Sequence, residues 1–307
     1  MGDDYIDISA GDFHSIALKS DTSLFAWGER DHSLTAVPSG NDYIAISDQL
    51  ALKRDGSIVA WGDHEPLDET QIPPDGNDFT AIDSGWKCHL ALKRDGSIVA
   101  WKNYGDDEVE TPPAGNDYIA LAAGYEHYIA LRSDGSIAAW GSDISGQVSG
   151  TPAGNDFVAI AAGDNHSLAL RSDGSITAWG WDEYGQVSGT PSGDDYIAVA
   201  AGYRHSLALK SDGSIVAWGW DSCGQATAPP GNNYTAIAAG YEYSVALVEN
   251  CNYTLAGDLN DDCKVDVYDF ALVAADWLDT YSDISFMADN WLIDCCADPS
   301  NSACVPK

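Results

Sequence analysis

The sequence predicts an all-β fold made of repeated three-stranded units, and three observations support this prediction. A unit of about 38 residues recurs from Asp4 to near Cys251 and is clearest at residues 195–232. Within each copy, short runs of β-branched, small apolar and aromatic residues alternate with a period of two, which is typical of half-buried strands. Most copies also carry an Asp-Gly dipeptide between two such runs, and this dipeptide favours a β-hairpin turn.

Each copy contains three predicted strands. In the clearest copy the runs are residues 196–202, which end in glycine, then residues 206–210 and residues 214–220. Asp212-Gly213 joins the second and third runs, and we expect a two-residue turn there because glycine tolerates positive φ. The dipeptide recurs in the same place and is degenerate in the first and last copies; its aspartates are Asp55, Asp95, Asp134 and Asp173. We therefore expect almost no helix in the repeats.

A repeat of this length predicts either a closed propeller or a stacked solenoid, because one copy cannot bury its own apolar face. We favour a seven-bladed β-propeller of short three-stranded blades, since a closed ring leaves only short sheet edges. Residues 1–256 are expected to form the seven repeats, and residues 257–307 a small helical module with a cysteine-rich end.

Two residue types recur in almost every copy, which indicates a structural role. The tryptophans are expected to pack inside or between blades; they are Trp27, Trp61, Trp101, Trp140, Trp179 and Trp218. The histidines of the pattern A-G-x-x-H are expected to form a hydrogen bond within their own blade; they are His14, His127, His166 and His205, with Cys88 and Tyr243 in two other copies. The second copy lacks this loop because four residues are deleted near residues 46–50.

The string A-G-x-x-H-S-x-A-L-x-x-D-G-x-x-x-x-W-G is followed by Gly-Gln at Gly146, Gly185 and Gly224. This pattern resembles the regulator of chromosome condensation repeat in its compact bacterial form, to which the propeller-type β-lactamase inhibitor proteins are also similar. The resemblance covers about residues 4–256. It implies a seven-bladed ring of three-stranded blades, and it implies the fold more firmly than any activity.

Composition excludes several classes of function. The chain has 48 acidic against 14 basic residues and a net charge of -34, so nucleic acid is not expected as a partner. No apolar run is long enough to span a membrane, and we do not expect the first residues to form a signal peptide, because they lack a basic start and an apolar core. We expect a monomer.

The cysteines indicate an oxidising compartment, either extracellular or at the cell surface. Five of seven lie in the last 57 residues, which predicts a disulfide framework; they are Cys251, Cys263, Cys295, Cys296 and Cys304. A zinc site is the alternative. It is disfavoured because no C-x-x-C pair is present and no histidine follows His205. The pairing of the cysteines stays open.

Function is expected where the copies differ. If the first run of each copy points up, the A-G-x-x loops and the start of the connectors share one end of the ring, and the Asp-Gly turns share the other. Eight of the 14 basic residues lie at the Asp-Gly end, interleaved with acids, which indicates a solvated face. The A-G-x-x end collects aromatic residues that we predict to bind a protein or a carbohydrate; they are Trp86, Tyr125, Trp181, Tyr184, Tyr203, Trp220 and Tyr241. The alternative is that these rings only pack loop against loop.

No catalytic motif is present, so we predict a non-catalytic binding or scaffold protein. The alternatives are a protein inhibitor of a hydrolase, a polysaccharide-active enzyme that uses acids at the mouth of the ring, and a guanine-nucleotide exchange factor. The acidic surface argues against nucleotide exchange.

Residues 258–269 fit a twelve-residue calcium loop. Oxygen ligands are expected from the side chains at positions 1, 3, 5, 9 and 12 and from the carbonyl at position 7; the residues are Asp258, Asn260, Asp262, Asp266, Asp269 and Lys264. An amphipathic helix is expected to follow, with Phe270, Val273, Trp277 and Leu278 on one face. An acidic linker with chance spacing is the alternative.

Residues 257–293 resemble a dockerin, and the resemblance implies calcium as cofactor and a cohesin-like scaffold protein as partner. Three departures from the dockerin pattern are present. Cys263 replaces glycine at loop position 6, the second loop is missing, and Val267 and Tyr268 occupy positions that often carry recognition hydroxyls. We therefore expect one calcium ion.

Overall fold

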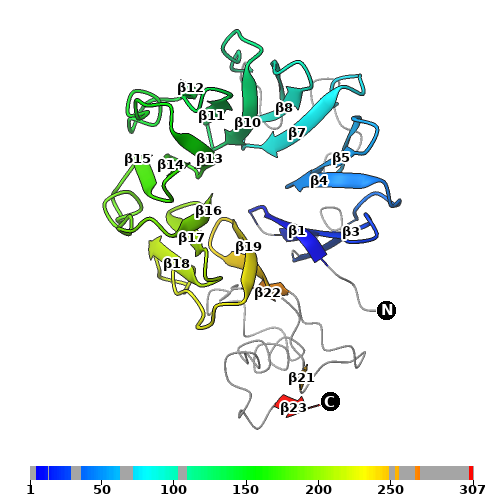
Figure 1. Cartoon of the computed structure of the whole chain (residues 1–307). Coiled ribbons are helices and arrows are strands. Elements are labelled where there is room, and N and C mark those ends of the chain that lie inside the picture. Colours follow the sequence, from blue (N-terminus) through cyan, green and yellow to red (C-terminus); the bar gives the residue numbers. More distant parts are fainter. Residues whose placement is uncertain are drawn as a thin grey trace.

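Three-stranded antiparallel sheets follow one another around a central opening (Figure 1). The computed structural model describes residues 5–12, 14–28, 36–62, 72–102, 109–248 and three short strands at 253–255, 267–269 and 304–306. This part of the chain contains seven such sheets and one two-stranded sheet. The prediction of an all-β chain of repeated three-stranded blades is confirmed. Apart from the short strands at residues 267–269 and 304–306, the predicted helical module lies outside the described residues.

The sheets are called blades 1 to 7 in chain order, and each contains an inner, a middle and an outer strand. The inner strands are β1 (Tyr5–Ala10), β4 (Tyr43–Ser47), β7 (Phe79–Ser84), β10 (Tyr118–Ala123), β13 (Phe157–Ala162), β16 (Tyr196–Ala201) and β19 (Tyr234–Ala239). The middle strands are β2 (His14–Lys19), β5 (Leu50–Lys53), β8 (Cys88–Lys93), β11 (His127–Arg132), β14 (His166–Arg171), β17 (His205–Lys210) and β20 (Ser244–Val248). The outer strands are β3 (Leu24–Gly28), β6 (Ile58–Ala60), β9 (Ile98–Lys102), β12 (Ile137–Gly141), β15 (Ile176–Gly180), β18 (Ile215–Gly219) and β22 (Val267–Asp269).

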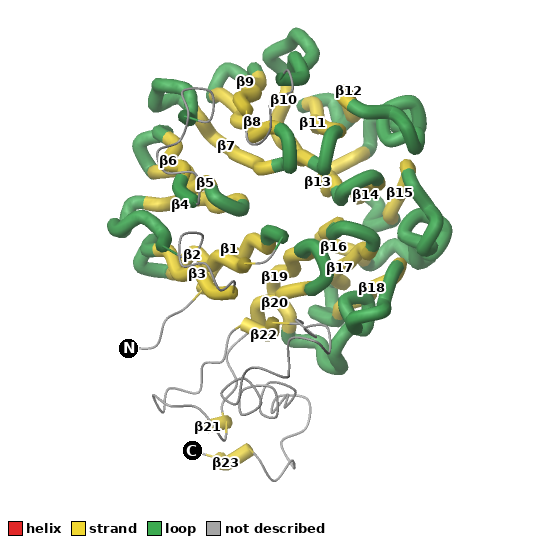
Figure 2. Tube along the Cα trace, turned by 180° about the vertical axis from the view of Figure 1, so that it is seen from behind, coloured by secondary structure: helices red, strands yellow, loops and turns green. Residues whose placement is uncertain are grey.

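The ring closes between the first and last blades, because β1 packs against β19 and β20. Figure 2 shows the same ring of sheets from the opposite side. The outer strand of blade 7 comes from a later part of the chain than the repeat pattern predicts. That pattern places it directly after Cys251, but β20 pairs with β22, and β21 (Tyr253–Leu255) pairs with β23 (Cys304–Pro306). Asn250-Cys251 stands where the other copies have the Asp-Gly dipeptide, so the sequence gives no strong hairpin signal after β20.

The hairpin turns differ from the two-residue turns that we predicted. Lys53 N donates to Ser57 O and Gly56 N donates to Lys53 O, so three residues lie in the loop. Only the glycine has positive φ, at 86°, while the Oδ1 atom of Asp55 accepts bonds from the N–H and hydroxyl of Ser57. This is the three-residue loop in which a type I turn is followed by a left-handed residue. The Asp-Gly dipeptide therefore predicted the position of the hairpin correctly, but the predicted loop length was wrong.

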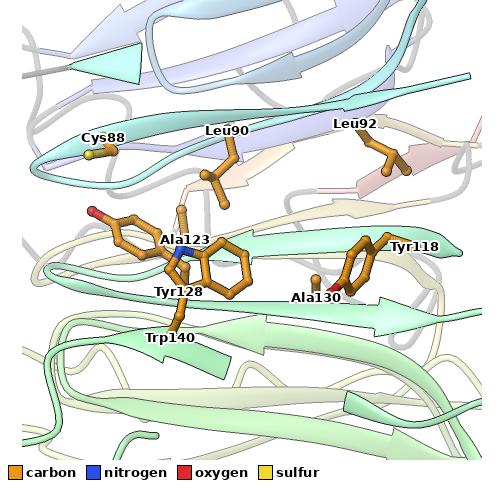
Figure 3. Close-up of a cluster of buried hydrophobic side chains, with 8 residues drawn as sticks. All are labelled: Cys88, Leu90, Leu92, Tyr118, Ala123, Tyr128, Ala130 and Trp140. Carbon is orange, nitrogen blue, oxygen red and sulfur yellow. The ribbon is translucent and has the colours of Figure 1, made fainter. Parts of the chain in front are cut away.

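The hydrophobic core is divided into clusters that lie between neighbouring blades. One of them joins Ala122, Ile129 and Leu131 of blade 4 to Phe157 and Trp179 of blade 5. Figure 3 shows the equivalent cluster between blades 3 and 4. The predicted inter-blade role of the tryptophans is therefore confirmed where their side chains are buried; these are Trp61, Trp101, Trp140, Trp179 and Trp218. Each blade depends on both neighbours for its core.

In six of the blades a glycine follows the inner strand, and it has no room for a side chain. A Cβ atom built on Gly163 would lie 2.3 Å from the carbonyl oxygen of Gly202 and 2.6 Å from the His166 ring. Gly124 has the same surroundings, with Gly163 O at 2.4 Å. Consecutive blades thus approach backbone to backbone around the opening. The A-G-x-x loops that follow these glycines are consequently held in one circle, which is called the loop end of the ring.

Candidate binding face and channel mouth

One hydrogen bond between neighbouring blades recurs at the loop end. Nε2 of His127 lies 2.8 Å from Oγ of Ser167, and the matching distance from His166 to Ser206 is 2.9 Å. His205 reaches Ser244 in the same way, at 2.9 Å. Our expectation of a histidine bond within each blade is therefore wrong. The histidine opens the middle strand of one blade, and its ring crosses to the middle strand of the next.

Two other copies fill the same place with different residues. Tyr243 of blade 7 donates its hydroxyl to the carbonyl of His14, and Ser15 donates to the Tyr243 hydroxyl at 3.2 Å, which links the last blade to the first. Between blades 3 and 4, Cys88 stands in the histidine position and Tyr128 in the serine position, and both lie in one buried cluster (Figure 3). A small and a large residue have exchanged places, so the space stays filled.

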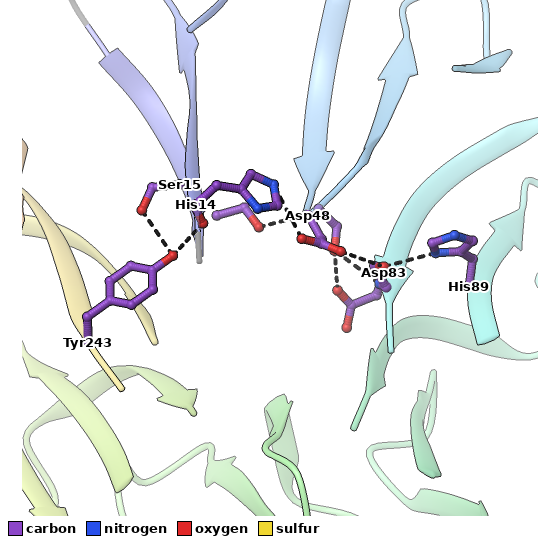
Figure 4. Close-up of polar contacts among 9 residues, drawn as sticks. His14, Ser15, Asp48, Asp83, His89 and Tyr243 are labelled. Carbon is purple, nitrogen blue, oxygen red and sulfur yellow. Dashed lines mark hydrogen bonds and ion pairs between the residues drawn. The ribbon is translucent and has the colours of Figure 1, made fainter. Parts of the chain in front are cut away.

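The deletion in blade 2 produces a polar network in place of the regular bond (Figure 4). Nε2 of His14 lies 3.4 Å from the carboxylate of Asp48, which has positive φ in the shortened turn. Ser47 Oγ donates to Asp83 at 2.6 Å, and Ala123 N donates to the same carboxylate at 2.8 Å. These contacts connect blades 1 to 4. Burial raises the pKa of both carboxyl groups. The charge of His14 counteracts this rise for Asp48, and the hydrogen bond from Ser47 counteracts it for Asp83.

Burial also keeps the linking histidines neutral. Removal from water lowers the pKa of His127 and His205 to about 4 and that of His166 to about 3. The His89 ring, 2.9 Å from Ser84 Oγ through Nδ1, has a pKa lowered to about 3 by burial. A neutral imidazole can accept a hydrogen bond from the serine hydroxyl or donate one to it, so these histidines fit a structural role. None of them is placed to act as a solvent-accessible base near neutral pH.

The Gly-Gln pairs fix the connectors that start at the loop end. Gln186 is fully buried, and its Oε1 atom accepts the N–H of Tyr184 at 2.9 Å. Its carbonyl accepts the indole N–H of Trp218 in the next blade at 2.9 Å. Gln147 holds Trp179 in the same way, at 2.8 Å. Each connector is thereby fastened to the following blade.

The predicted aromatic residues form two groups. Trp86 and Tyr125 of blades 3 and 4 stack at 5.4 Å with 13° between their planes, and their side chains remain 40% and 37% exposed. In the second group, Tyr203 and Tyr241 stack at 4.1 Å, and Trp220 packs edge-on against Tyr203 at 6.4 Å. All seven predicted residues therefore lie near the loop end, but the structure brings five of them together and keeps two apart.

Arg204 lies at the centre of the second group. Its guanidinium carbon is 4.2 Å from the ring centre of Tyr203, and it also lies within 5.5 Å of the rings of Trp181, Tyr184 and Trp220. It donates hydrogen bonds to the hydroxyls of Tyr184 and Tyr203. A cation among aromatic faces stabilises such a cluster. Our sequence analysis missed Arg204, although it is the only arginine in an A-G-x-x loop.

The inner strands enclose a channel with a volume of about 780 Å³. Aliphatic residues such as Ile46, Ile160 and Val199 line it, and at the loop end it is bordered by acidic and aromatic residues. Burial and the neighbouring Asp12 raise the pKa of Asp164 to about 8, while Arg204 acts in the opposite direction. The sequence predicts acids at the ring mouth only as a class and does not single out Asp12 or Asp164.

The opposite end of the ring repeats one self-contained unit. In blade 4, Arg132 Nη1 lies 2.7 Å from Asp117, and its guanidinium lies 4.6 Å above the Tyr118 ring. Arg171 with Asp156 and Lys210 with Asp195 repeat the pair in the next two blades. Each of these basic residues is therefore paired with an aspartate of its own blade.

The predicted metal ligands are not tested by the structure. Asp258, Asn260, Asp262, Lys264 and Asp266 lie outside the described residues, and Asp269 is described only as part of strand β22. The cysteine cluster likewise lies outside them, apart from the backbone of Cys304 in β23. Within the described ranges no three metal-ligating side chains come together, and no helix there could cross a bilayer.

Comparison with known proteins identifies the repeats and the fold. The family model of the regulator of chromosome condensation (RCC1) repeat matches residues 5–32, 118–147, 157–186 and 196–225. No match was found among curated proteins. The chain has an RCC1-like β-propeller fold.

Three solved structures show this fold at low sequence identity. The ectodomain of the Physcomitrella patens receptor kinase CR4 has a TM-score of 0.66 and 19% identity, over 80% of this chain and 71% of that one. The CRINKLY WD40 ectodomain of the Arabidopsis thaliana receptor kinase ACR4 has a TM-score of 0.61 and 19% identity, over 81% and 94%. Prp20p from Saccharomyces cerevisiae, whose structure was described with its binding to Gsp1p and histones, has a TM-score of 0.50 and 20% identity, over 81% and 70%.

The buried histidines predict a specific pH dependence of stability. Unfolded histidines titrate near pH 6.5, whereas His127, His166 and His205 stay neutral in the fold down to about pH 4 or 3. Below pH 6.5 the unfolded state therefore binds more protons, and each histidine lowers the free energy of unfolding by about 1 kcal/mol per pH unit. Above pH 6.5 these residues have no effect.

The contribution of one histidine can be isolated by comparing variants, because the buried carboxyl groups with raised pKa values act in the opposite direction at lower pH. Urea unfolding of the wild type and of His166→Gln should be measured between pH 6.5 and 5. The free energy should fall less steeply in the variant, by about 1 kcal/mol per pH unit. Parallel slopes would show that His166 is not held neutral by burial.

Proposed function

We propose that this chain is a non-catalytic, seven-bladed scaffold that binds a protein at the loop end of the ring. The difference between the two ends carries the proposal. The Asp-Gly end repeats the same compensated ion pair from blade to blade, as in Arg132–Asp117 and Arg171–Asp156. The loop end has a different residue after the glycine in several blades, and exposed aromatic rings such as Trp86 lie there.

The proposed binding face includes all seven predicted aromatic residues, which have two different roles. The stacked pair Trp86 and Tyr125 is more than a third exposed and offers contact area directly. The group around Arg204 is partly buried and supplies a rigid surface beside it. Aromatic residues and arginine dominate the binding energy of many protein interfaces. The binding of Gsp1p and histones named for Prp20p supports a protein rather than a carbohydrate as the ligand class.

The proposal predicts that the exposed aromatic pair contributes strongly to affinity. Protein ligands should be captured from the native secretome with the full chain and identified, and their affinity measured for Trp86→Ala and Tyr125→Ala. Each variant should weaken binding by about tenfold or more, because a central aromatic contact is worth about 2 kcal/mol. Ile119→Ala is the matched control, since Ile119 is 56% exposed and lies in inner strand β10 away from the loop end.

Equal affinity of all three variants would remove the loop end as the binding face. Inhibition assays against a panel of hydrolases test the inhibitor alternative with the same proteins. Release of reducing sugars from polysaccharides tests the enzyme alternative.

We further propose that residues 257–307 form a small helical module that binds one calcium ion and attaches the propeller to a cohesin-like scaffold outside the cell. The spacing of Asp258, Asn260 and Asp262, together with the clustered cysteines, supports this proposal. Carboxylate and amide oxygens at these intervals match the ligands that calcium prefers. Disulfides among the cysteines are expected in that compartment.

This second proposal predicts stoichiometric calcium binding by the full chain. Calorimetric titration of the metal-free protein should show about one tight equivalent. Asp258→Asn with Asp262→Asn should abolish it, because two charged ligands are lost. Asp117→Asn with Asp156→Asn removes the same charge from the propeller and should leave calcium binding unchanged. Absence of a calcium signal in the wild type would contradict the proposal.

A further inference from the structure

The channel mouth at the loop end is built from one position of the repeat. The residue directly after the glycine lines the channel in six blades, and the shortened turn of blade 2 supplies a seventh. In order around the ring these residues are Asp12, Asp48, Trp86, Tyr125, Asp164, Tyr203 and Tyr241. Two stacked aromatic pairs therefore alternate with acidic residues. The mouth differs in this respect from the aliphatic channel wall beneath it.

The acidic and phenolic groups of the mouth are close enough to influence one another electrostatically. Asp12 belongs to blade 1 and Asp164 to blade 5, yet the charge of Asp12 raises the pKa of Asp164. Both carboxylates also raise the pKa of the Tyr125 hydroxyl, after the larger effect of burial. The Tyr241 hydroxyl is affected by Asp164 in the same direction. Hydrogen-bond acceptors from opposite sides of the ring thus surround the mouth.

The carboxylate of Asp164 has no hydrogen-bond donor among the described residues. Its backbone is used, because Asp164 N donates to Gly202 O at 3.4 Å and its carbonyl accepts from Tyr125 N at 3.2 Å. The nearby guanidinium of Arg204 instead donates to Tyr184 and Tyr203. The side chain is partly exposed in the channel mouth, so it can accept a hydrogen bond from a ligand there. Asp83, in contrast, accepts bonds from Ser47 and Ala123.

We propose that the channel mouth binds one organic cation with N–H donors, namely the ammonium of a lysine or the guanidinium of an arginine side chain presented by a protein ligand. The carboxylate of Asp164 accepts from the cation, and the stacked pairs Trp86–Tyr125 and Tyr203–Tyr241 flank its aliphatic stem. This proposal specifies the ligand chemistry of the proposed protein-binding function and rests on it for the source of the side chain. The chain's net charge of -34 favours a basic ligand.

Two other kinds of cation fit the mouth less well. A divalent metal needs several oxygen ligands around one point, and the described residues contain no such group. A quaternary ammonium has no N–H group, so it would leave the Asp164 carboxylate without a hydrogen bond. The mouth should therefore distinguish lysine from its trimethylated form.

The test titrates the full chain with Nα-acetyl-lysine methylamide and Nα-acetyl-arginine methylamide at a pH above the Asp164 pKa of about 8, so that the carboxyl group is ionised. Binding is followed by NMR chemical shifts or calorimetry. The norleucine and trimethyl-lysine derivatives are the matched probes without N–H donors on the side chain. Binding of the lysine or arginine derivative should weaken by about tenfold in Asp164→Asn, because a charge-assisted hydrogen bond is lost. Asp194→Asn, which removes an exposed carboxylate on the loop before β16, should bind as the wild type.

Three outcomes would overturn the inference: no binding of either basic derivative, equal binding of trimethyl-lysine, or equal binding by Asp164→Asn. Failure of the proposed function gives a different pattern. In that case the derivatives bind and depend on Asp164, but no captured protein loses affinity when Asp164 is replaced. That result would confirm the cation site for small free ligands and contradict its use by a protein ligand.

Discussion

The ring depends on a close backbone contact between neighbouring blades that only glycine permits. Gly124, Gly163 and Gly202 end the inner strands of three consecutive blades, and each lacks space for a Cβ atom because the next glycine carbonyl or a histidine ring occupies it. A single side-chain pair then joins the middle strands across each of these contacts, as His166 and Ser206 do. Since the contact is short and buried, this hydrogen bond adds a directional constraint to the apolar packing between the blades.

This arrangement separates what must stay constant from what can vary. The histidine that links two blades comes only three positions after the glycine, and the residue directly after the glycine faces the channel mouth. That residue can be Asp164 in one blade and Tyr203 in the next without altering the link. The opposite end varies less, because in five of the blades an arginine or lysine such as Arg132 packs over an aromatic ring and pairs with an aspartate. Recognition is therefore expected at the loop end.

The sequence was sufficient to predict the strands, the blades and the end of the ring at which the aromatic residues lie. It failed where the outcome depended on a neighbouring copy. The hydrogen bond of His127 crosses to Ser167 because the blades approach closely at glycine, and nothing within one repeat shows that distance. The exchange of Cys88 and Tyr128 could have indicated the contact, since a histidine and a serine position change together in adjacent copies. Arg204 was missed because its aromatic partners come from two connectors as well as from its own loop.

The central claim is that side chains at the start of the middle strands hold one blade to the next. A double-mutant cycle on His166 and Ser206 tests it most directly, with unfolding free energies of the wild type, His166→Ala, Ser206→Ala and the double variant. Because the two groups bond across an interface from which water is excluded, a coupling energy of about 1 kcal/mol is expected. Additive effects of the two substitutions would contradict the account.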